Sequence, residues 1–325
     1  MPRRKLRGAR QNGSVNAKEG VDASRPLLLL ECTMGEVQPN PHLRDTRMTE
    51  ETTYDTVTAL SEADATGEIA EIFADIRQTM EIPLLTSIWR ILVDFECGLS
   101  TTWNAVKPLY ATQQPEAALA RLRHDAEFPM LEAILPTELR DADVSGEELP
   151  AIKAIVAAYN RSNSLNLLTQ TAIVIEPSEK YAAYQQTPPA EQFPALPALP
   201  TRDEIDDQVW KTVLKVNDYG TSEDDRGLAT FYRHLAHWPG LLELMDSKLA
   251  PTRDSGSIER CAKSVFAVIR EEGARMAHLR DDRQVAAIPQ DAFDKVATYV
   301  STPHTVTRIV SIGTGIGRWL DTADR

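Results

Sequence analysis

The sequence has few cysteines and no long apolar run. Cys32, Cys97 and Cys261 form no CxxC pair and leave an odd count in a chain of 325 residues. We therefore expect neither a disulfide framework nor a cysteine-rich metal site, and we interpret the three as buried or incidental thiols. No apolar stretch reaches the roughly 18 residues that a membrane span needs, and Leu27–Leu30 is too short for a secretory signal. These absences predict a protein of the cytoplasm with no membrane-spanning segment.

Positive charge is scarce as well. The chain has 35 Lys and Arg against 48 Asp and Glu, which gives a net charge of −13. Because contacts to phosphate dominate affinity for nucleic acid, this balance argues against nucleic-acid binding through a general basic surface. We therefore expect the substrate to be a small molecule.

Residues 1–50 differ in character from the rest of the chain. They begin with the basic run MPRRKLRGAR, and up to about Pro41 they are rich in Asn, Gly, Ser and Pro without apolar periodicity. Such a composition is typical of disorder. Acidic residues from Glu19 onward weaken the case for a transit peptide, and Met48 would make a natural start. We expect residues 1–50 to form a disordered extension outside the fold.

Apolar residues at helical spacing dominate the remainder of the chain. From Thr66 they follow one another at i, i+3, i+4 and i+7 until Pro83 ends the segment. No segment alternates as a strand would, so the predicted fold class is all-α. Helices are expected at about residues 66–80, 84–95, 99–110, 116–125, 147–160, 165–175, 205–216, 228–237, 241–249, 258–270, 291–300 and 305–320.

One structural unit is used twice in the chain. Arg90 aligns with Arg233, since 233 − 90 = 143, and Pro108 aligns with Pro251 at the same separation. A period this long indicates duplicated domains, because the repeats of solenoids run about 20 to 50 residues. The late segments IVAAYNRSN and KVATYVSTP also align. We predict two tandem pseudo-symmetric helical repeats, residues 60–180 and 205–320, with a small-molecule site in the cleft between them.

A proline-rich linker is expected to join the two repeats over residues 186–204. Five prolines and few large apolar residues occur there, a composition that cannot continue a helix and suits an extended connector.

Two arginines hold equivalent places in the two repeats. Arg90 follows Ser87 by three residues, and Arg233 follows Thr230 by three. Two guanidinium groups facing one cleft could hold a carboxylate bidentately. The structural alternative is that each arginine caps or salt-bridges its own repeat, as a device copied with the duplication.

Other polar residues admit two interpretations. His234 and His237 invite a metal hypothesis, but without a third ligand at a telling spacing we interpret them as surface or supporting histidines and predict no metal. Asp224 and Asp225 could supply a base, or they could favour the start of the helix that follows them.

The GTGIG run at residues 313–317 resembles a phosphate-binding loop in spelling only. It falls within an apolar helical pattern, whereas a dinucleotide loop follows a strand and opens a helix. Small residues that permit close helix packing are the expectation, and no nucleotide is predicted.

Three segments of the chain resemble a known family. GEIAEIFADIRQTMEIP, IVAAYNRSNSLNLL and LAHWPGLLELMDSKLAP are similar to the group I 2-haloacid dehalogenase family, also called halocarboxylic acid dehydrogenase, and the likeness covers about residues 60–320. The resemblance implies a cofactor-free hydrolase in which an aspartate activates water for direct displacement of halide at C2 of a 2-haloacid. Either enantiomer is inverted, and the site lies between the repeats.

The resemblance also implies roles for individual residues. Asn163 matches the family's active-site asparagine, and Tyr299 matches a tyrosine of the site. Thr230 matches the serine that precedes the catalytic aspartate, but Phe231 stands where that aspartate belongs. Aromatic residues that line the site in the family correspond here to Leu84 and Ser87.

Two hypotheses follow from the exchange at Phe231, because phenylalanine supplies no base. The first is a dehalogenase-like hydrolase in which Asn163, Thr230, Arg233 and Tyr299 surround the substrate and Asp225 or Asp224 is the replacement base. The alternative is a non-catalytic carboxylic-acid-binding or interaction protein on the same fold. Both predict a small carboxylic acid as ligand and no cofactor, and a homodimer is a further hypothesis.

Overall fold

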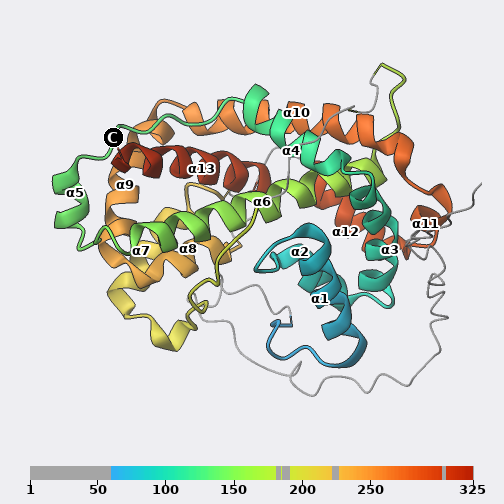
Figure 1. Ribbon diagram of the computed structural model, residues 1–325, viewed down its shortest axis with the longest axis horizontal. Helices are drawn as coiled ribbons and strands as arrows, with labels where there is room; N and C mark the ends of the chain where they lie inside the picture. Colours follow the sequence, from blue (N-terminus) through green and yellow to red (C-terminus); the bar gives the residue numbers. More distant parts are fainter. Residues whose placement is uncertain (1–59, 181–183, 185–190, 222–226, 302–304, 325) are drawn as a thin grey trace, which may run out of the picture. The chain divides into compact units, whose positions relative to one another are not determined.

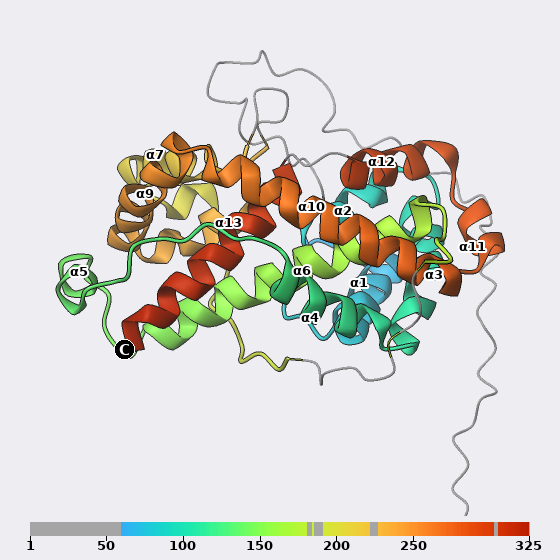
Figure 2. The same cartoon turned by 90° about the horizontal axis from the view of Figure 1, so that it is seen from above.

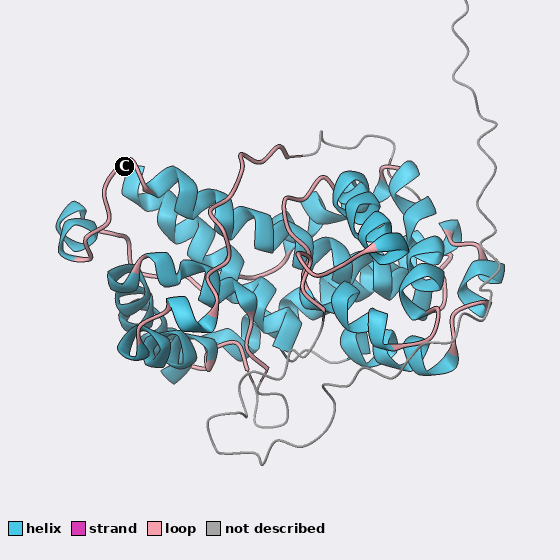
Figure 3. Cartoon of the chain, turned by 90° about the horizontal axis from the view of Figure 1, so that it is seen from below, coloured by secondary structure: helices cyan, strands magenta, loops and turns pink. Residues whose placement is uncertain are grey.

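The computed structural model describes residues 60–180, 184, 191–221, 227–301 and 305–324. Helices joined by loops make up this part of the chain, and it contains no strand (Figure 3). The predicted all-α class is thereby confirmed. Within the same residues no helix is both long and apolar enough to cross a membrane. The predicted N-terminal extension and both candidate bases, Asp224 and Asp225, lie outside the described residues.

Helices of the first half of the chain end with a long one (Figure 1). In chain order they are α1 (Gly67–Met80), α2 (Ser87–Ile91), the 3-10 helix η2 (Leu92–Asp94), α3 (Gly98–Ala111), α4 (Gln114–Asp125), α5 (Pro136–Asp141) and α6 (Leu149–Val174).

The second half contains further helices of similar lengths. In chain order they are η3 (Arg202–Glu204), α7 (Asp207–Asn217), α8 (Thr230–His234), η4 (Leu235–His237), α9 (Pro239–Asp254), α10 (Ser257–Met276), η5 (Ala277–Leu279), α11 (Asp282–Ala286), α12 (Gln290–Ser301), α13 (Thr305–Leu320) and η6 (Asp321–Asp324).

Helix α1 forms and ends as its sequence predicts. Its apolar face buries Phe73, Ile76 and Met80, and Arg77 in the last turn complements the helix dipole. The helix stops where Glu81 adopts a left-handed conformation with φ 51°, and its backbone N–H bonds back to the last turn.

Helix α6 corrects one sequence prediction. Separate helices were expected over residues 147–160 and 165–175, but a single helix of 26 residues spans both. The segment Arg161–Ser164 breaks the apolar periodicity without containing a helix-breaking residue, so the helix continues through it. A polar stretch in the middle of a buried helix was thus mistaken for a connection.

The apolar interior consists of two clusters of buried side chains. The first core combines α1 to α4 with the C-terminal half of α6, from Leu165 to Ile173, and with α12. The second core combines the N-terminal half of α6, from Leu149 to Tyr159, with α7, α8, α9 and the C-terminal half of α13. Helix α6 therefore passes from one core to the other, with α1 to α3 beside one of its ends and α7 to α9 beside the other (Figures 1 and 2).

Close helix packing is observed at the GTGIG run, as predicted. The run lies inside α13, which packs along α6. A Cβ atom added to Gly313 would lie 2.2 Å from the Oδ1 atom of Asn160, and one added to Gly315 would lie 2.8 Å from the carbonyl oxygen of Pro129. Absence of side chains at these positions lets α13 approach its neighbours closely.

The cysteines differ in state. Cys261 is a buried free thiol, as expected. Cys97 is disulfide-bonded, so the interpretation of all three cysteines as thiols is wrong for this residue. An odd count and the absence of CxxC spacing exclude a disulfide framework, but they do not exclude a single bridge.

Candidate functional site

Polar side chains concentrate where α6 passes between the two cores. Arg161, Ser162, Asn163, Ser164 and Asn166 are all buried, with exposed fractions of 8% or less. Apolar residues of the second core precede this segment and those of the first core follow it. Burial of so many polar groups is costly unless they have partners or serve a ligand, so this segment is the natural place to look for a site.

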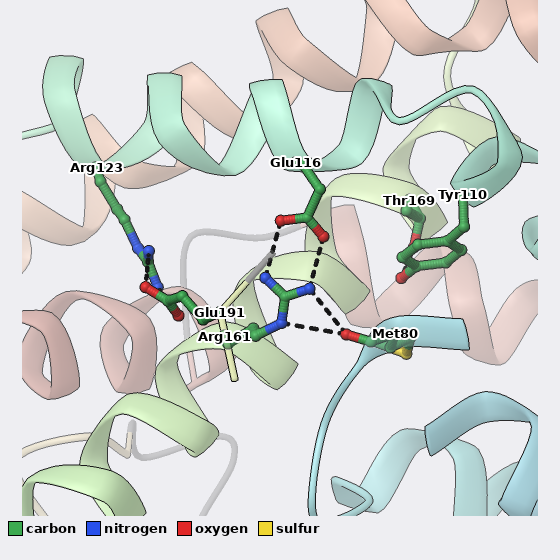
Figure 4. A network of polar contacts seen from close by, with 7 residues as sticks. All are labelled: Met80, Tyr110, Glu116, Arg123, Arg161, Thr169 and Glu191. Carbon is green, nitrogen blue, oxygen red and sulfur yellow. Dashed lines mark hydrogen bonds and ion pairs between the residues drawn. The ribbon is translucent and has the colours of Figure 1, made fainter. Parts of the chain in front are cut away.

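One part of the segment is anchored by an ion pair. Figure 4 shows the guanidinium of Arg161 donating to both carboxylate oxygens of Glu116, at 2.9 and 2.6 Å, and to the carbonyl oxygen of Met80. These contacts join the ends of α1 and α4 to the middle of α6. They hold the backbone of α6 two residues before Asn163.

A second anchor fixes α2 on α6. The indole nitrogen Nε1 of Trp89 donates to Oδ1 of Asn166 at 2.8 Å, and Nδ2 of Asn166 donates to the hydroxyl oxygen of Thr86 at 2.6 Å. Both polar ends of the Asn166 amide are therefore used. Arg90, the next residue after Trp89, is carried to the same region by this packing.

Arg90 and Arg233 are buried or half-buried residues whose guanidinium groups form no hydrogen bond or ion pair with a described residue. Arg90 is only 8% exposed, and the Nε atoms of both arginines are buried with no hydrogen-bond acceptor. Neither arginine forms an ion pair with any described residue, so the salt-bridge alternative is not what this part of the chain contains.

The two guanidinium groups also influence each other. Burial lowers the pKa of Arg90, the nearby Tyr159 and Glu62 oppose that effect, and the positive charge of Arg233 lowers the pKa further. Arg90 on α2 and Arg233 on α8 thus bring two positive charges into one region that an anion would neutralise.

Tyr159 lies between these arginines and a buried histidine. Its hydroxyl is 3.3 Å from Nδ1 of His234, and Nε2 of His234 is 2.8 Å from the carbonyl oxygen of Pro197. A carbonyl only accepts, so Nε2 carries the hydrogen, Nδ1 of the neutral ring has the lone pair, and the Tyr159 hydroxyl donates to it. The Thr230 side chain is a further polar neighbour of Tyr159 and acts to lower its pKa.

Burial favours the neutral forms of the Tyr159 and His234 side chains and shifts their pKa values accordingly. It raises the pKa of Tyr159 to about 12, although the nearby Thr230 hydroxyl and the two arginines act in the opposite direction. Burial also lowers the pKa of His234, the Pro197 carbonyl opposes this, and His237 and Arg233 lower it further. His234 is therefore a neutral imidazole at neutral pH.

Comparison with known proteins identifies relatives of this chain. No protein-family model matches the sequence. A configuration-inverting 2-haloacid dehalogenase of Alcaligenes xylosoxydans xylosoxydans is 25% identical over 227 residues, which are 65% of this chain and 75% of that protein. One of Pseudomonas sp. (strain 113) is 25% identical over 225 residues, 64% of this chain and 71% of that protein. The chain is a distant homologue of the configuration-inverting 2-haloacid dehalogenases. The family resemblance read from the sequence is confirmed.

Solved structures agree on the fold. A D-2-haloacid dehalogenase mutant in complex with D-2-CPA superposes with a TM-score of 0.65 at 16% identity, covering 81% of this chain and 95% of that one. The complex of D-2-haloacid dehalogenase with L-LA gives the same TM-score, identity and coverage. At such low identity these structures establish a shared fold with the dehalogenases and nothing finer.

Two of the residues that the resemblance matches to the dehalogenase site are related to Tyr159. Asn163 is 8% exposed, follows Tyr159 by one helical turn and forms no side-chain hydrogen bond to a described residue. Thr230 is the first residue of α8 and is half-buried.

Phe231, which the sequence resemblance matches to the dehalogenase aspartate, is only 1% exposed and belongs to the second core. Its ring centroid is 5.5 Å from that of Tyr159 and 4.9 Å from that of Tyr232.

The residues predicted to line the substrate are more dispersed. Leu84 is half-buried against the second core, and Ser87 is the first residue of α2. Tyr299 lies on α12 against the first core, where burial raises its pKa, and no described hydrogen bond or ring contact connects it to Tyr159. No group of three or more potential metal ligands occurs in the described ranges.

Sequence reasoning missed the contact between Tyr159 and His234. Tyr159 was noticed only as the counterpart of Tyr299, and His234 was interpreted as a surface or supporting residue. A signal was present, because Tyr159 precedes Asn163 by four residues and so shares its helix face. No spacing could have placed His234, which lies 75 residues further along the chain.

Proposed function

We propose that the protein is a dehalogenase-like hydrolase that displaces halide from small 2-haloacids by direct attack of water. One observation carries the proposal. Arg90 and Arg233 come from two different helices, interact electrostatically and form no hydrogen bond or ion pair within the described part of the chain, as a carboxylate-binding pair requires. The homology to inverting 2-haloacid dehalogenases supports the reaction class.

The proposed roles follow from the chemistry of each side chain. The guanidinium groups of Arg90 and Arg233 hold the substrate carboxylate, which orients C2 toward the polar middle of α6. Asn163 is a buried residue whose side chain forms no hydrogen bond to a described residue, and Thr230 has a hydroxyl at the start of α8, so both can orient the substrate or water. The oxygen of water forms the new bond to C2 as the carbon–halide bond breaks, and the halide leaves with the bonding electrons.

The remaining assignments rest on the family resemblance. Leu84, Ser87, Phe231 and Tyr299 belong to the substrate wall in this proposal. Asp225 or Asp224, just before α8, is the replacement base that the sequence offers. The reaction requires the substrate, water and side chains, with no cofactor.

We also propose that the fold is a tandem duplication and that the arginine pair is its product. The series α1, α2, η2, α3 and α4 has the same order of helix types as α7, α8, η4, α9 and α10. Gln113 before α4 and Gly256 before α10 both adopt left-handed conformations, with φ of 58° and 66°. These correspondences support equivalent origins for Arg90 and Arg233, with residues 186–204 as the linker.

The test is halide release from each enantiomer of 2-chloropropionate by the purified protein. We expect release by the wild type and a loss of about 10²-fold or more in kcat/KM for Arg90→Met and Arg233→Met, because each removes a charged hydrogen-bonding partner of the carboxylate. Arg123→Met is the matched control, since Arg123 pairs with Glu191 at a part-exposed position. A wild type that releases no halide from either enantiomer contradicts the proposal.

A second function is favoured by the burial of Phe231. Since this residue is packed in the second core and supplies no base, the protein would be a non-catalytic carboxylic-acid-binding or interaction protein. Calorimetric titration with 2-chloropropionate and lactate separates the two functions. Saturable binding that Arg90→Met abolishes, without halide release by the wild type, is the result expected of a binding protein.

A further inference from the structure

Tyr159 and His234 are joined by a hydrogen bond and have no role in the proposed function so far, and Thr230 is a polar neighbour of Tyr159. We propose that Thr230, Tyr159 and His234 form a chain that carries away the proton of the attacking water, with His234 as its acceptor. The inference rests on the proposed hydrolysis and deepens it, because it assigns the base to His234 in place of Asp225 or Asp224 where Phe231 replaces the expected carboxylate.

The direction of the hydrogen bonds fits proton transfer toward His234. The bond from Nε2 of His234 to the carbonyl of Pro197 leaves the lone pair of the neutral ring on Nδ1. The Tyr159 hydroxyl must then donate to Nδ1, which leaves the lone pairs of the Tyr159 oxygen to accept a proton from the neighbouring Thr230 hydroxyl. In the proposed transfer each member donates inward to the next, and the chain ends on a nitrogen that can hold a proton.

The two ends of this series of side chains differ in their exposure to solvent. Thr230 is half-buried at the start of α8, whereas Tyr159 and His234 are 4% and 3% exposed. The outer hydroxyl can therefore contact a water molecule next to the arginine pair, and the inner imidazole is shielded from bulk water. A neutral imidazole is a competent general base near neutral pH.

Other described groups near Arg90 are poor candidates for this task. Glu62 is the carboxylate that acts on Arg90, but its Oε2 accepts from Arg77 at 2.8 Å and its Oε1 accepts from the backbone N–H of Leu85 at 2.8 Å. Arg233 cannot accept a proton because a guanidinium has no lone pair to offer. The charged or titratable groups that act on His234 are Tyr159, His237 and Arg233.

The transfer step balances. The water oxygen bonds to C2, the halide leaves with its electron pair, and the water proton passes to the Thr230 oxygen. The Thr230 proton moves to the Tyr159 oxygen, and the Tyr159 proton moves to Nδ1 of His234. The resulting imidazolium strengthens its hydrogen bond to the Pro197 carbonyl. It later releases one proton to solvent, so the products are a 2-hydroxy acid, halide and a proton.

A purely structural role for His234 is the competing explanation. Its Nε2 holds the segment around Pro197 against α8, and His237 makes an equivalent 2.8 Å contact to the carbonyl of Ala198. His237→Asn is consequently a matched control, because it removes a contact to the same segment without touching Tyr159.

The experiment measures kcat, KM and their pH dependence for halide release. We expect His234→Asn to lower kcat by about 10² to 10⁴ with little change in KM, because asparagine can accept from Tyr159 but is not a base. The acidic limb of the kcat profile should disappear with it. Thr230→Val should lower kcat similarly, Thr230→Ser should restore most of it, and His237→Asn should resemble the wild type.

Several results would contradict the role of His234 as proton acceptor. Halide release by His234→Asn within about fivefold of the wild type, or equal losses in His234→Asn and His237→Asn, removes the proton-acceptor role and leaves the proposed hydrolysis standing. Loss of release in Asp225→Ala or Asp224→Ala alone assigns the base to that aspartate. A wild type without halide release overturns both proposals. Lactate binding and circular dichroism of each variant establish that its site is folded. If His234→Asn does not fold, the kcat of Thr230→Val tests the proton-transfer role instead.

Discussion

Arg161 and Glu116 form a bidentate ion pair in the protein interior. The Nη1 and Nη2 atoms of the arginine donate to the two carboxylate oxygens at 2.9 and 2.6 Å, and the arginine side chain is 1% exposed. The same guanidinium satisfies the carbonyl of Met80 at the end of α1. Since Arg161 precedes Asn163 by two residues, this pair fixes the part of α6 that carries the candidate site.

Removing one partner of this pair should destabilise the protein. Glu116→Gln leaves the buried guanidinium without a counter-charge, and we expect the free energy of unfolding to fall by about 3 kcal/mol. Denaturant unfolding followed by circular dichroism measures the change. Glu191→Gln is the control, because the Arg123–Glu191 pair in Figure 4 is part-exposed and its loss should cost less than about 1 kcal/mol. Equal effects of the two variants would contradict the structural role assigned to Arg161.

The crossing of α10 and α6 depends on a glycine. A Cβ atom at Gly273 would lie 2.4 Å from Cγ2 and 2.8 Å from Cβ of Thr171, whose branched side chain cannot move aside easily. We expect Gly273→Ala to lower the free energy of unfolding by about 1 to 3 kcal/mol through overpacking. Gly146→Ala, at a position with open space around it, should change stability by no more than about 0.5 kcal/mol. Denaturant unfolding of both variants measures these changes in the free energy of unfolding.

Arg90 should lower the stability of the folded protein and be needed for ligand binding. Its side chain is buried and forms no hydrogen bond or ion pair with a described residue, so Arg90→Met removes a charge that only the electrostatic effect of Glu62 offsets, and we expect an increase of about 0.5 to 2 kcal/mol in the free energy of unfolding. The stabilisation that lactate or 2-chloropropionate gives to the wild type should be lost in the same variant. Thermal unfolding with and without ligand measures both effects. A variant that is less stable and still ligand-stabilised would argue for a structural Arg90.

The buried His234 should make stability depend on pH. Burial lowers its pKa in the folded protein, so the unfolded chain takes up a proton at a higher pH than the folded one. The stability contribution is therefore present above the ordinary histidine pKa of about 6.5 and is lost as the pH falls through the folded pKa.

We expect the free energy of unfolding to drop more between pH 8 and pH 5 in the wild type than in His234→Asn. Each unit of depression in the pKa corresponds to about 1.4 kcal/mol. Urea unfolding of both proteins at the two pH values gives the comparison. Equal drops in the two proteins would mean that His234 titrates alike in the folded and unfolded chains.

Sequence periodicity predicted the helices well where one face is apolar and failed where a helix is buried all round. Helix α13 was expected at its observed bounds, because its amphipathic pattern is clear. Helix α6 was divided in two, because its middle is polar and its burial comes from neighbours on several sides. The polar segment in the middle of α6 belongs to the candidate site and is not a loop.

By itself, the sequence determined the all-α class and the dehalogenase relationship, and it predicted that Arg90 and Arg233 are equivalent, because helical periodicity and internal similarity are properties of residue order. Only the tertiary structure decided that neither arginine pairs with a described residue and that Tyr159 reaches His234. Such facts depend on side chains from α2, α6 and α8 that meet across long stretches of chain. Burial and hydrogen bonding between distant helices set the charge states of these groups, and no local pattern of residues encodes them.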